Sequence, residues 1–394
     1  MLTDISNKSR IAIVAVGYNR INSMKRLIGS LLRARYNIDN VPLYISIDCS
    51  GDQELYDYVN SFEWPYGDKY VNIQKERLGL KNHILQCGDL TKYFKGVIIL
   101  EDDIFVSEYF YDYVLQAVDY YYDDNRIGGI SLYRNEMGGN IPIYLAQDGN
   151  DVFLRQSVAS WGQCWTDKMW AGFREWFNKP ESDDLSHVDM PEYIKGWSKA
   201  WSKFYMAYQI VTNKYFIFPS ISLTTCFSEA GEHGSTCTIG QVNLLCGEKK
   251  YKFQPFDKLS KYDIYSTNES IYDWIGISKE QLAVDLRGSY PDLTGKKFVL
   301  SPYPYPYTIV KSFSLSLLPI ELNVKYNLEG NGIYLYDISK HTGKKLQKNI
   351  PIDIAYYYIK TFNVRLLARY VLNYSRNAIL DKLSKKWKKI RTRR

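Results

Sequence analysis

The sequence predicts an α/β protein whose core is a doubly wound, mostly parallel sheet. Continuous apolar runs such as residues 11–16, IAIVAV, recur between residues 11 and 133 and are typical of strands buried on both faces. Stretches with apolar residues at three- and four-residue spacing separate these runs, and they are typical of amphipathic helices. Strands that alternate with helices favour parallel pairing, because a parallel neighbour needs a long crossover connection.

The strand and helix patterns follow one another without a gap along this part of the chain. We expect strands at residues 11–16, 41–48, 69–74, 96–103 and 127–133, and helices at about residues 24–32, 54–62, 79–90 and 107–124. In doubly wound sheets, ligands bind at the carboxyl ends of the strands. Asp48 and the acidic triplet Glu101–Asp103 both lie at such ends, so we expect them to face one crevice.

The chain beyond residue 140 is less regular. Residues 193–211, YIKGWSKAWSKFYMAYQIV, predict one helix, and residues 215–227 predict a pair of strands broken by Pro219. From about residue 251 the composition changes. Residues 320–338 alternate around the sequence EGNG and predict a β-hairpin. We therefore divide the chain into a sheet domain (1–250), a C-terminal β-rich appendage (251–360) and a terminal segment (361–394).

The terminal segment is basic and predicts an amphipathic helix. From Arg365 to Arg394 it has eleven Lys or Arg and one acid, so the rest of a chain with a net charge of +7 is slightly acidic. Its Leu, Tyr and Trp residues recur at helical spacing between the basic ones. This pattern favours binding to an anionic membrane surface. Nucleic-acid binding or a solvated tail is the alternative, and the acidic body argues against nucleic acid.

The remaining composition is that of a globular protein. The longest apolar runs are far shorter than the ~20 residues of a membrane-spanning helix. The N-terminus has no apolar signal core, and the six cysteines form no CxxC pair, which favours reduced thiols. We expect a cytoplasmic protein that is peripheral on the inner face of the cell membrane.

The triplet Glu101–Asp103, in the sequence VIILEDDIF, is the most informative motif. Three adjacent carboxylates at the end of a buried strand repel one another and need a positive partner. Oxygen ligands suit Mn²⁺ or Mg²⁺, and one or two carboxylates are sufficient when substrate phosphates complete the coordination shell. The alternative is a solvated turn whose acids cap the helix that starts near Ser107. The position at a strand end favours a metal site.

Several short motifs in order resemble the GT-A fold glycosyltransferases. They are VAVGYNR (14–20), SID (46–48), RLGLKNHI (77–84), VIILEDDIFVSEYF (97–110), SWGQCW (160–165) and PSISLTTCFSEAGEHGS (219–235). The resemblance covers about residues 9–245. It is strongest to nucleotide-sugar-dependent enzymes of the bacterial polysaccharide type that are related to the animal N-acetylglucosaminyltransferase I group. It implies a GT-A type sheet, a donor pocket for a UDP-linked sugar and a divalent metal ion.

The resemblance also implies roles for individual residues. Asp103 and His233 would bind the metal ion, and the other donor-binding residues would be Tyr18, Arg20, Asp48, Arg77, Lys81, Glu101 and Asp102. In this scheme Tyr18, Arg20 and Asp48 hold the base and ribose, whereas Arg77 and Lys81 approach the diphosphate. Each residue has a simpler alternative: Arg77 and Lys81 as surface charges, Asp48 as a turn cap, and His233 as an ordinary loop histidine.

The catalytic base is the part of the scheme that the sequence supports least. An inverting transferase needs a carboxylate that takes the proton of the acceptor hydroxyl. In the related animal enzymes an acid lies in a Trp-flanked segment, but that segment is here GWSKAWSK (196–203) and contains none. Asp189 and Glu192 are the candidates nearest to the helix start, although helix capping explains them equally well.

Together these features predict a metal-dependent glycosyltransferase that moves a sugar to a lipid-linked or growing surface glycan. One alternative is a membrane-peripheral sugar-binding or scaffold protein with a degenerate transferase fold, since the acid is missing from residues 196–203. A sugar-phosphate nucleotidyltransferase is less favoured. That class needs a glycine-rich first loop, which VGYNRINSMKR (16–26) is not.

Overall fold

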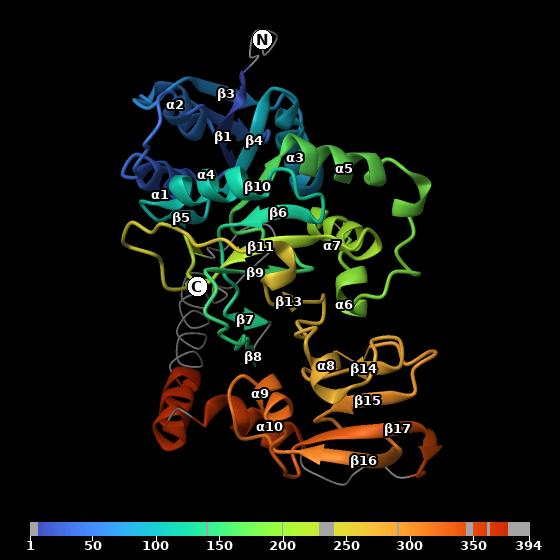
Figure 1. Ribbon diagram of the computed structural model, residues 1–394. Coiled ribbons are helices and arrows are strands. Elements are labelled where there is room, and N and C mark those ends of the chain that lie inside the picture. The colour runs from blue at the N-terminus through green and yellow to red at the C-terminus, as the bar shows by residue number, and fades with distance from the viewer. Residues whose placement is uncertain are drawn as a thin grey trace, which may run out of the picture.

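The computed structural model describes residues 7–138, 141–198, 200–227, 240–289, 291–343, 350–360 and 363–376. It contains a large sheet flanked by helices and a smaller C-terminal unit built on a second sheet (Figure 1). Separate clusters of buried apolar side chains lie under the two sheets. Among the described residues, no helix is both long enough and apolar enough to cross a bilayer.

The large sheet has nine strands among the described residues, in the spatial order β13-β9-β11-β6-β10-β4-β1-β2-β3. These strands are β1 (Asn7–Gly17), β2 (Leu43–Ile47), β3 (Lys69–Ile73), β4 (Phe94–Glu101), β6 (Ile127–Ser131), β9 (Val152–Arg155), β10 (Gln163–Thr166), β11 (Tyr215–Pro219) and β13 (Lys261–Tyr262). The pairings of β1 with β2 and β4, of β2 with β3 and of β6 with β11 are parallel. β10 is antiparallel to β4 and β6, and β9 is antiparallel to β11. The predicted mixed α/β class with a mostly parallel sheet is therefore confirmed.

Helices cover both faces of this sheet (Figure 1). They are α1 (Ile21–Leu31), α2 (Gln53–Ser61), α3 (Gly79–Gly88), α4 (Phe110–Tyr121), α5 (Asp167–Phe177), α6 (Glu192–Lys195) and α7 (Trp201–Val211), with short 3-10 helices at Asp89–Lys92, Pro180–Ser182 and Phe256–Lys258. α1 and α4 lie on one side, and α3, α5 and α7 lie on the other. On the second side, the Trp165 ring of β10 lies 4.8 Å from that of Trp170 and 5.3 Å from that of Tyr205, measured between centroids. Aromatic packing thus joins α5 and α7 to the sheet.

The predicted alternation of strands and helices up to residue 133 is confirmed, and the later predictions need two corrections. Residues 193–211 are two helices, because the chain leaves the helix at Gly196 and starts again after Ala200, which has extended backbone angles. The strands within residues 215–227 form as expected but do not pair with each other. The second, β12 (Thr224–Cys226), pairs instead with β5 (Ile104–Val106), while β7 (Met137–Gly138) pairs with β8 (Ile141–Pro142).

The C-terminal unit contains a four-stranded sheet in the order β14-β15-β17-β16. Its elements are α8 (Ile271–Ile275), β14 (Leu282–Val284), β15 (Phe298–Ser301), β16 (Tyr307–Phe313), α9 (Glu321–Lys325), β17 (Ile333–His341) and α10 (Ile350–Ile359). The β-rich appendage is present, but the predicted hairpin around EGNG is wrong. Residues before this turn form α9, because the buried Asn323 side chain bonds the backbone of Ser316, Leu317 and Ile320 and holds that segment in a turn. The antiparallel partners of β17 are β15 and β16.

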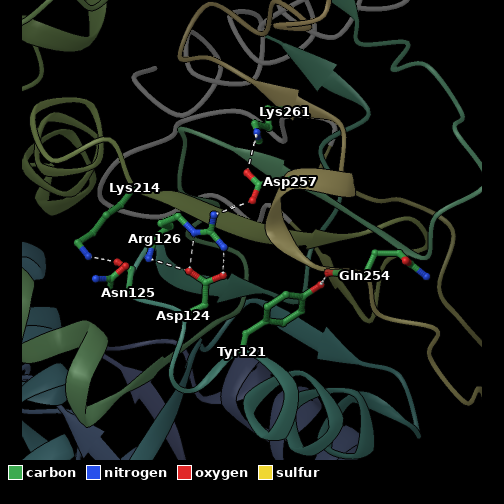
Figure 2. A network of polar contacts seen from close by, with 8 residues as sticks. All are labelled: Tyr121, Asp124, Asn125, Arg126, Lys214, Gln254, Asp257 and Lys261. Carbon is green, nitrogen blue, oxygen red and sulfur yellow. Dashed lines mark hydrogen bonds and ion pairs between the residues drawn. The ribbon is translucent and has the colours of Figure 1, made fainter.

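The large unit continues beyond residue 250, where the sequence division was set. Figure 2 shows Arg126, which follows α4, bonded to both carboxylate oxygens of Asp124 and to Asp257 at 3.0 Å. The Tyr121 hydroxyl donates to the carbonyl of Gln254 at 2.7 Å. These contacts hold the segment that precedes β13 against the end of α4. The core of the large unit extends to Ile264. The core of the C-terminal unit begins at Ile271.

Candidate functional site

The acidic triplet lies at the carboxyl end of β4, beside the carboxyl ends of the parallel strands β1 and β2. Glu101 is the last residue of β4 and pairs with Val16 of β1. At the end of β2, the Asp48 N–H donates to the carbonyl of Gly17 at 2.9 Å. The turn after β1, the end of β2 and the triplet therefore share one edge of the sheet. This is the edge at which doubly wound folds bind their ligands.

Arg20 is the positive partner of the triplet. Its guanidinium forms a two-point contact with the Asp102 carboxylate through Nε and Nη2, and Nη2 also lies 3.3 Å from Oδ2 of Asp103. The Asp102 side chain is 5% exposed, whereas that of Asp103 is 16% exposed. Burial lowers the pKa of Arg20, but its contacts with Asp102 and Asp103 outweigh this effect and raise the pKa overall. Asp102 is thus the buried anchor for Arg20, and Asp103 keeps a surface that solvent can reach.

Glu101 differs from its two neighbours in charge. Burial, together with the charges of Asp103 and Asp102, raises the pKa of Glu101 to about 8, and Arg20 only partly offsets these effects. The protonated form of Glu101 is therefore favoured at neutral pH. With Asp102, Asp103 and Arg20 all charged, the triplet and its partner carry a net charge of about −1.

Asp48 is occupied as a cap for the start of α3. Its Oδ1 accepts hydrogen bonds from the N–H groups of Cys49 at 2.9 Å and Leu78 at 2.8 Å, and its Oδ2 accepts one from Gly79 at 2.9 Å. Gly79 has a φ of +71°, a backbone angle that glycine adopts without strain. These bonds fix the segment that carries Arg77 and Lys81 against the end of β2.

Tyr18 and Arg77 meet beside this cap. The Arg77 guanidinium lies 5.0 Å from the centroid of the Tyr18 ring, with Arg77 exposed and Tyr18 half-buried. Lys81, one turn further along α3, lies over the ring of Phe204 on α7 at 5.2 Å. The structure thus brings Tyr18, Arg20, Asp48, Arg77 and the triplet to one edge. Lys81 lies at the contact between α3 and α7.

The first part of the motif PSISLTTCFSEAGEHGS (219–235), which contains His233 further along, lies directly on the triplet. β12 pairs with β5, and the Phe227 N–H donates to the carbonyl of Asp103 at 2.9 Å. The Thr224 hydroxyl donates to the carbonyl of Trp161 at 2.6 Å, which links SWGQCW to the same segment. His233 itself lies outside the described residues, so its role stays a prediction.

The two candidate bases lie elsewhere. Asp189 is exposed and accepts a hydrogen bond from the Tyr265 hydroxyl at 2.6 Å, close to the join with the C-terminal unit. Glu192 is 85% exposed and pairs with Lys195 within α6 at 2.8 Å. Figure 1 shows α6 on the opposite side of β6 and β11 from β5, the strand that follows the triplet. The described contacts do not bring either acid to the triplet, and their catalytic role stays a prediction.

The side chains at this edge supply only part of the coordination shell that a divalent metal ion needs. Within the described part of the chain, no three Asp, Glu, His or Cys side chains converge to enclose a metal ion. Asp102 is committed to Arg20, which leaves the partly exposed Asp103 as the main protein ligand. A single carboxylate holds Mg²⁺ or Mn²⁺ when phosphate oxygens and water fill the other positions. The site therefore suits an ion that arrives together with a phosphate-bearing substrate.

His83 is a buried residue near the site that the sequence did not single out. Its Nε2 lies 2.7 Å from the Ser46 hydroxyl, and burial lowers the pKa of His83 to about 4, although the charge of Asp48 raises it. The unfolded value is about 6.5, so stability is independent of this group above that pH. As the pH falls from about 6.5 to about 4, the unfolded chain binds a proton that the folded chain excludes. This difference costs ~3 kcal/mol of stability.

We expect His83→Gln to reduce the decrease in the free energy of unfolding that acid causes. Urea denaturation at about pH 7.5 and about pH 4.5 measures this loss in the parent chain and in the variant. The parent should lose more stability than the variant by ~2–3 kcal/mol, since carboxylates that titrate in the same range are common to both. Equal losses would show that His83 is not held neutral by burial.

The sequence pointed to Arg20, Asp102 and Trp161 but did not reveal the long-range contacts that hold them. The Arg20–Asp102 pair joins positions 82 residues apart, so no local pattern marks it. Trp161 at the edge of SWGQCW packs its ring against Tyr133 at 4.8 Å, and only its place in a motif indicated that it lies near the site.

Comparison with known proteins finds similar structures at low identity. The sequence matches no family model and no curated protein. Residues 1–349 of TarS from S. aureus, in complex with UDP-GlcNAc, match with 13% identity and a TM-score of 0.38, over 58% of this chain and 62% of that one. The mannosyltransferase PcManGT from Pyrobaculum calidifontis, in complex with GDP-Man and Mn²⁺, matches with 13% identity and a TM-score of 0.27, over 34% and 38%.

GalNAc-T7 with UDP, GalNAc and Mn²⁺ matches with 12% identity and a TM-score of 0.39, over 54% of this chain and 43% of that one. The chain thus spans about three fifths of the length of the TarS structure. Similarities of this size carry no argument about activity, so the function is argued from the site.

Proposed function

We propose that the chain is a glycosyltransferase that moves a sugar from a nucleotide-sugar donor to a lipid-linked or growing surface glycan with the help of Mn²⁺ or Mg²⁺. The observation that carries the proposal is the partly exposed Asp103, held by Arg20 at the carboxyl edge of the parallel strands beside Tyr18 and Arg77. A bound ion would neutralise the charge that develops on the departing nucleoside diphosphate.

In this proposal the predicted donor-binding residues have different roles. Tyr18 and the backbone fixed by Asp48 border the base and ribose of a donor, preferably a UDP-linked one. Arg77 and Lys81 supply positive charge for the diphosphate. Arg20 orients Asp103 and reduces the negative charge that would repel a phosphate. The acceptor proton needs a base, for which Asp189 and Glu192 remain the proposed residues, with inversion at the transferred sugar.

The test is release of nucleoside diphosphate from a panel of nucleotide sugars with Mn²⁺ present. We expect slow hydrolysis with at least one donor, and a metal-dependent rise in thermal stability with that donor. Donor binding that persists without turnover, even with a matched acceptor, favours the alternative of a sugar-binding or scaffold protein. Neither binding nor hydrolysis with any donor contradicts both functions.

We further propose that the end of the chain binds an anionic membrane surface, on the inner face of the cell membrane, so that the enzyme meets a lipid-linked acceptor. Residues 364–376 are helical and exposed along nearly their whole length. Leu366, Tyr370 and Tyr374 share one face of this helix, whereas Arg365 and Arg369 lie on the other. Exposed apolar and basic faces on one helix are typical of interfacial binding, to which each Lys or Arg contributes about 1 kcal/mol.

Removal of the chain after residue 363 is therefore expected to abolish binding to vesicles that contain phosphatidylglycerol. Co-sedimentation of the full chain and the truncated chain measures this, with phosphatidylcholine vesicles as the neutral control. The combined substitution of Arg365, Arg369 and Arg376 by Gln should weaken binding to the anionic vesicles only. Equal sedimentation of the full and truncated chains would contradict the proposal.

A further inference from the structure

The C-terminal unit contains a cavity of about 350 Å³ that lies apart from the acidic triplet. It is lined by the start of β17, the segment after β16 and the last turn of α10, including Ser314, Asn331, Tyr334, Tyr356, Tyr357 and Lys360. In Figure 1 these elements lie at the far end of the molecule from α1 and α2. The volume is near the lower end of the roughly 300–1,000 Å³ of small-molecule sites, and it leaves room for a mono- or disaccharide.

Asn331 and Gly332 of EGNG line one side of this cavity, and both glycines of the turn pack closely against residues 314–315. A Cβ on Gly332 would lie 2.3 Å from the Cβ of Leu315 and 2.6 Å from its backbone nitrogen, and one on Gly330 would lie 2.8 Å from the Cα of Ser314. The Gly332 N–H donates to the carbonyl of Phe313 at 2.8 Å. The turn is therefore packed against residues 314–315 at a distance that only glycine permits. This gives the cavity a wall fixed by backbone contacts.

Two adjacent tyrosines of α10 line the cavity. Tyr357 is buried, and its hydroxyl donates to the carbonyl of Leu317 at 2.7 Å. Tyr356, by contrast, is 59% exposed. Tyr334 of β17 also borders the cavity, but its side chain packs with that of Tyr336 in a separate cluster. A buried aromatic ring beside an exposed one suits a flat, partly apolar ligand.

Polar groups are interleaved with these rings. The Lys360 ammonium lies 4.7 Å from the centroid of the Tyr357 ring and donates to the carbonyl of Ser316. Ser314 and Asn331 add a hydroxyl and an amide. A sugar ring offers an apolar face of C–H groups and a rim of hydroxyls, which matches rings beside short polar side chains. Among the described residues, Lys360 alone supplies a positive charge to the lining, and a nucleoside diphosphate would need more than one cation.

We propose that this cavity binds a saccharide unit of the acceptor glycan, with Tyr356 stacking on the sugar and Lys360 favouring a unit that carries a carboxylate. The link to an acceptor rests on the proposed transferase function; the saccharide site itself does not. A second binding point on the C-terminal unit would hold a long glycan to the enzyme while its end reaches the acidic triplet.

Saturation-transfer NMR on the full chain tests the site, with methyl glycosides of glucose, galactose, N-acetylglucosamine and glucuronic acid as probes. We expect at least one glycoside to bind. Tyr356→Ala should weaken that binding at least about tenfold, whereas Tyr326→Ala should leave it unchanged. Tyr326 is the matched control, because it is also 59% exposed on the C-terminal unit. Lys360→Gln should weaken the glucuronide more than the neutral glycosides.

Thermal unfolding of the variants and donor hydrolysis separate this proposal from the transferase. Tyr356→Ala should unfold like the parent chain and hydrolyse a donor at the same rate without an acceptor. If no donor is hydrolysed but glycoside binding depends on Tyr356, the transferase function fails and the saccharide site stands. Absence of binding by every glycoside, or binding that Tyr356→Ala does not weaken, would overturn the saccharide site.

Discussion

Asp103→Asn is expected to reduce metal-dependent turnover of the donor by roughly 10²–10³-fold while leaving the fold intact. The substitution keeps the shape of the side chain but removes the charge that would hold the divalent ion. Asp103 is only the second partner of Arg20, at 3.3 Å, and its side chain reaches solvent. Stability should therefore change by less than about 1 kcal/mol. Nucleoside diphosphate release against Mn²⁺ concentration, together with thermal unfolding, measures both effects.

Two control variants make this result specific. Asp119→Asn removes an exposed carboxylate from α4 and should change neither turnover nor stability. Asp102→Asn should lower stability by ~2–4 kcal/mol, because it leaves the guanidinium of Arg20 without its buried partner. A chain with Asp103→Asn that still turns over its donor at the parent rate, with the same Mn²⁺ dependence, would remove Asp103 from the site.

Local sequence patterns could not distinguish Asp102 from Asp103, and only the resemblance to GT-A transferases implied that Asp103 binds the metal ion. In VIILEDDIF the two carboxylates are adjacent and chemically identical, and the sequence suggested that a metal ion and a diphosphate balance the whole triplet. In the structure, Arg20 already balances Asp102, and burial favours the protonated form of Glu101. What remains for an ion is chiefly Asp103. The charge balance depends on a contact across 82 residues, which no local pattern reveals.

The fold of the first 133 residues was predictable because most of the central strands there are buried on both faces, although β3 at the edge is only half-buried. β2 and the middle of β4 are continuously buried, so they appear as unbroken apolar runs. The C-terminal unit was harder to predict for the opposite reason. β16 alternates little and is largely exposed, whereas α9 contains the buried polar residues Glu321 and Asn323. A strand pattern was therefore assigned to a segment that tertiary hydrogen bonds hold as a helix.

A buried ion cluster joins the two units, and this too arises only from tertiary contacts. Arg155 of β9 donates to the hydroxyl of Ser266, and Arg287 of the C-terminal unit donates to the carbonyl of the same residue at 2.7 Å. Arg287 also pairs with Glu321 at 2.9 Å, and the Glu321 side chain is fully buried. Burial and the nearby charge of Arg287 together lower the pKa of Arg155 to about 10, although Asp263 partly offsets them. Glu321 thus supplies negative charge beside the buried guanidinium of Arg287.

Glu321→Gln is therefore expected to destabilise the C-terminal unit by ~3–5 kcal/mol. The variant keeps the size of the side chain but removes the carboxylate that pairs with the buried Arg287, which lies near a second buried guanidinium, that of Arg155. Urea denaturation followed by Trp fluorescence measures the loss, and limited proteolysis between residues 263 and 270 reports whether the units separate. Glu192→Gln, which breaks the exposed pair with Lys195, is the matched control and should cost less than about 1 kcal/mol.

The double variant Glu321→Leu with Arg287→Met distinguishes an uncompensated charge from lost packing. Replacing both partners by apolar side chains removes the charge that has to be buried, so the double variant should be more stable than Glu321→Gln alone by ~2 kcal/mol or more. If the double variant is instead as unstable as the sum of the single substitutions, packing and hydrogen bonding dominate the cluster. A loss below about 1 kcal/mol for Glu321→Gln would mean that water reaches the cluster and screens its charges.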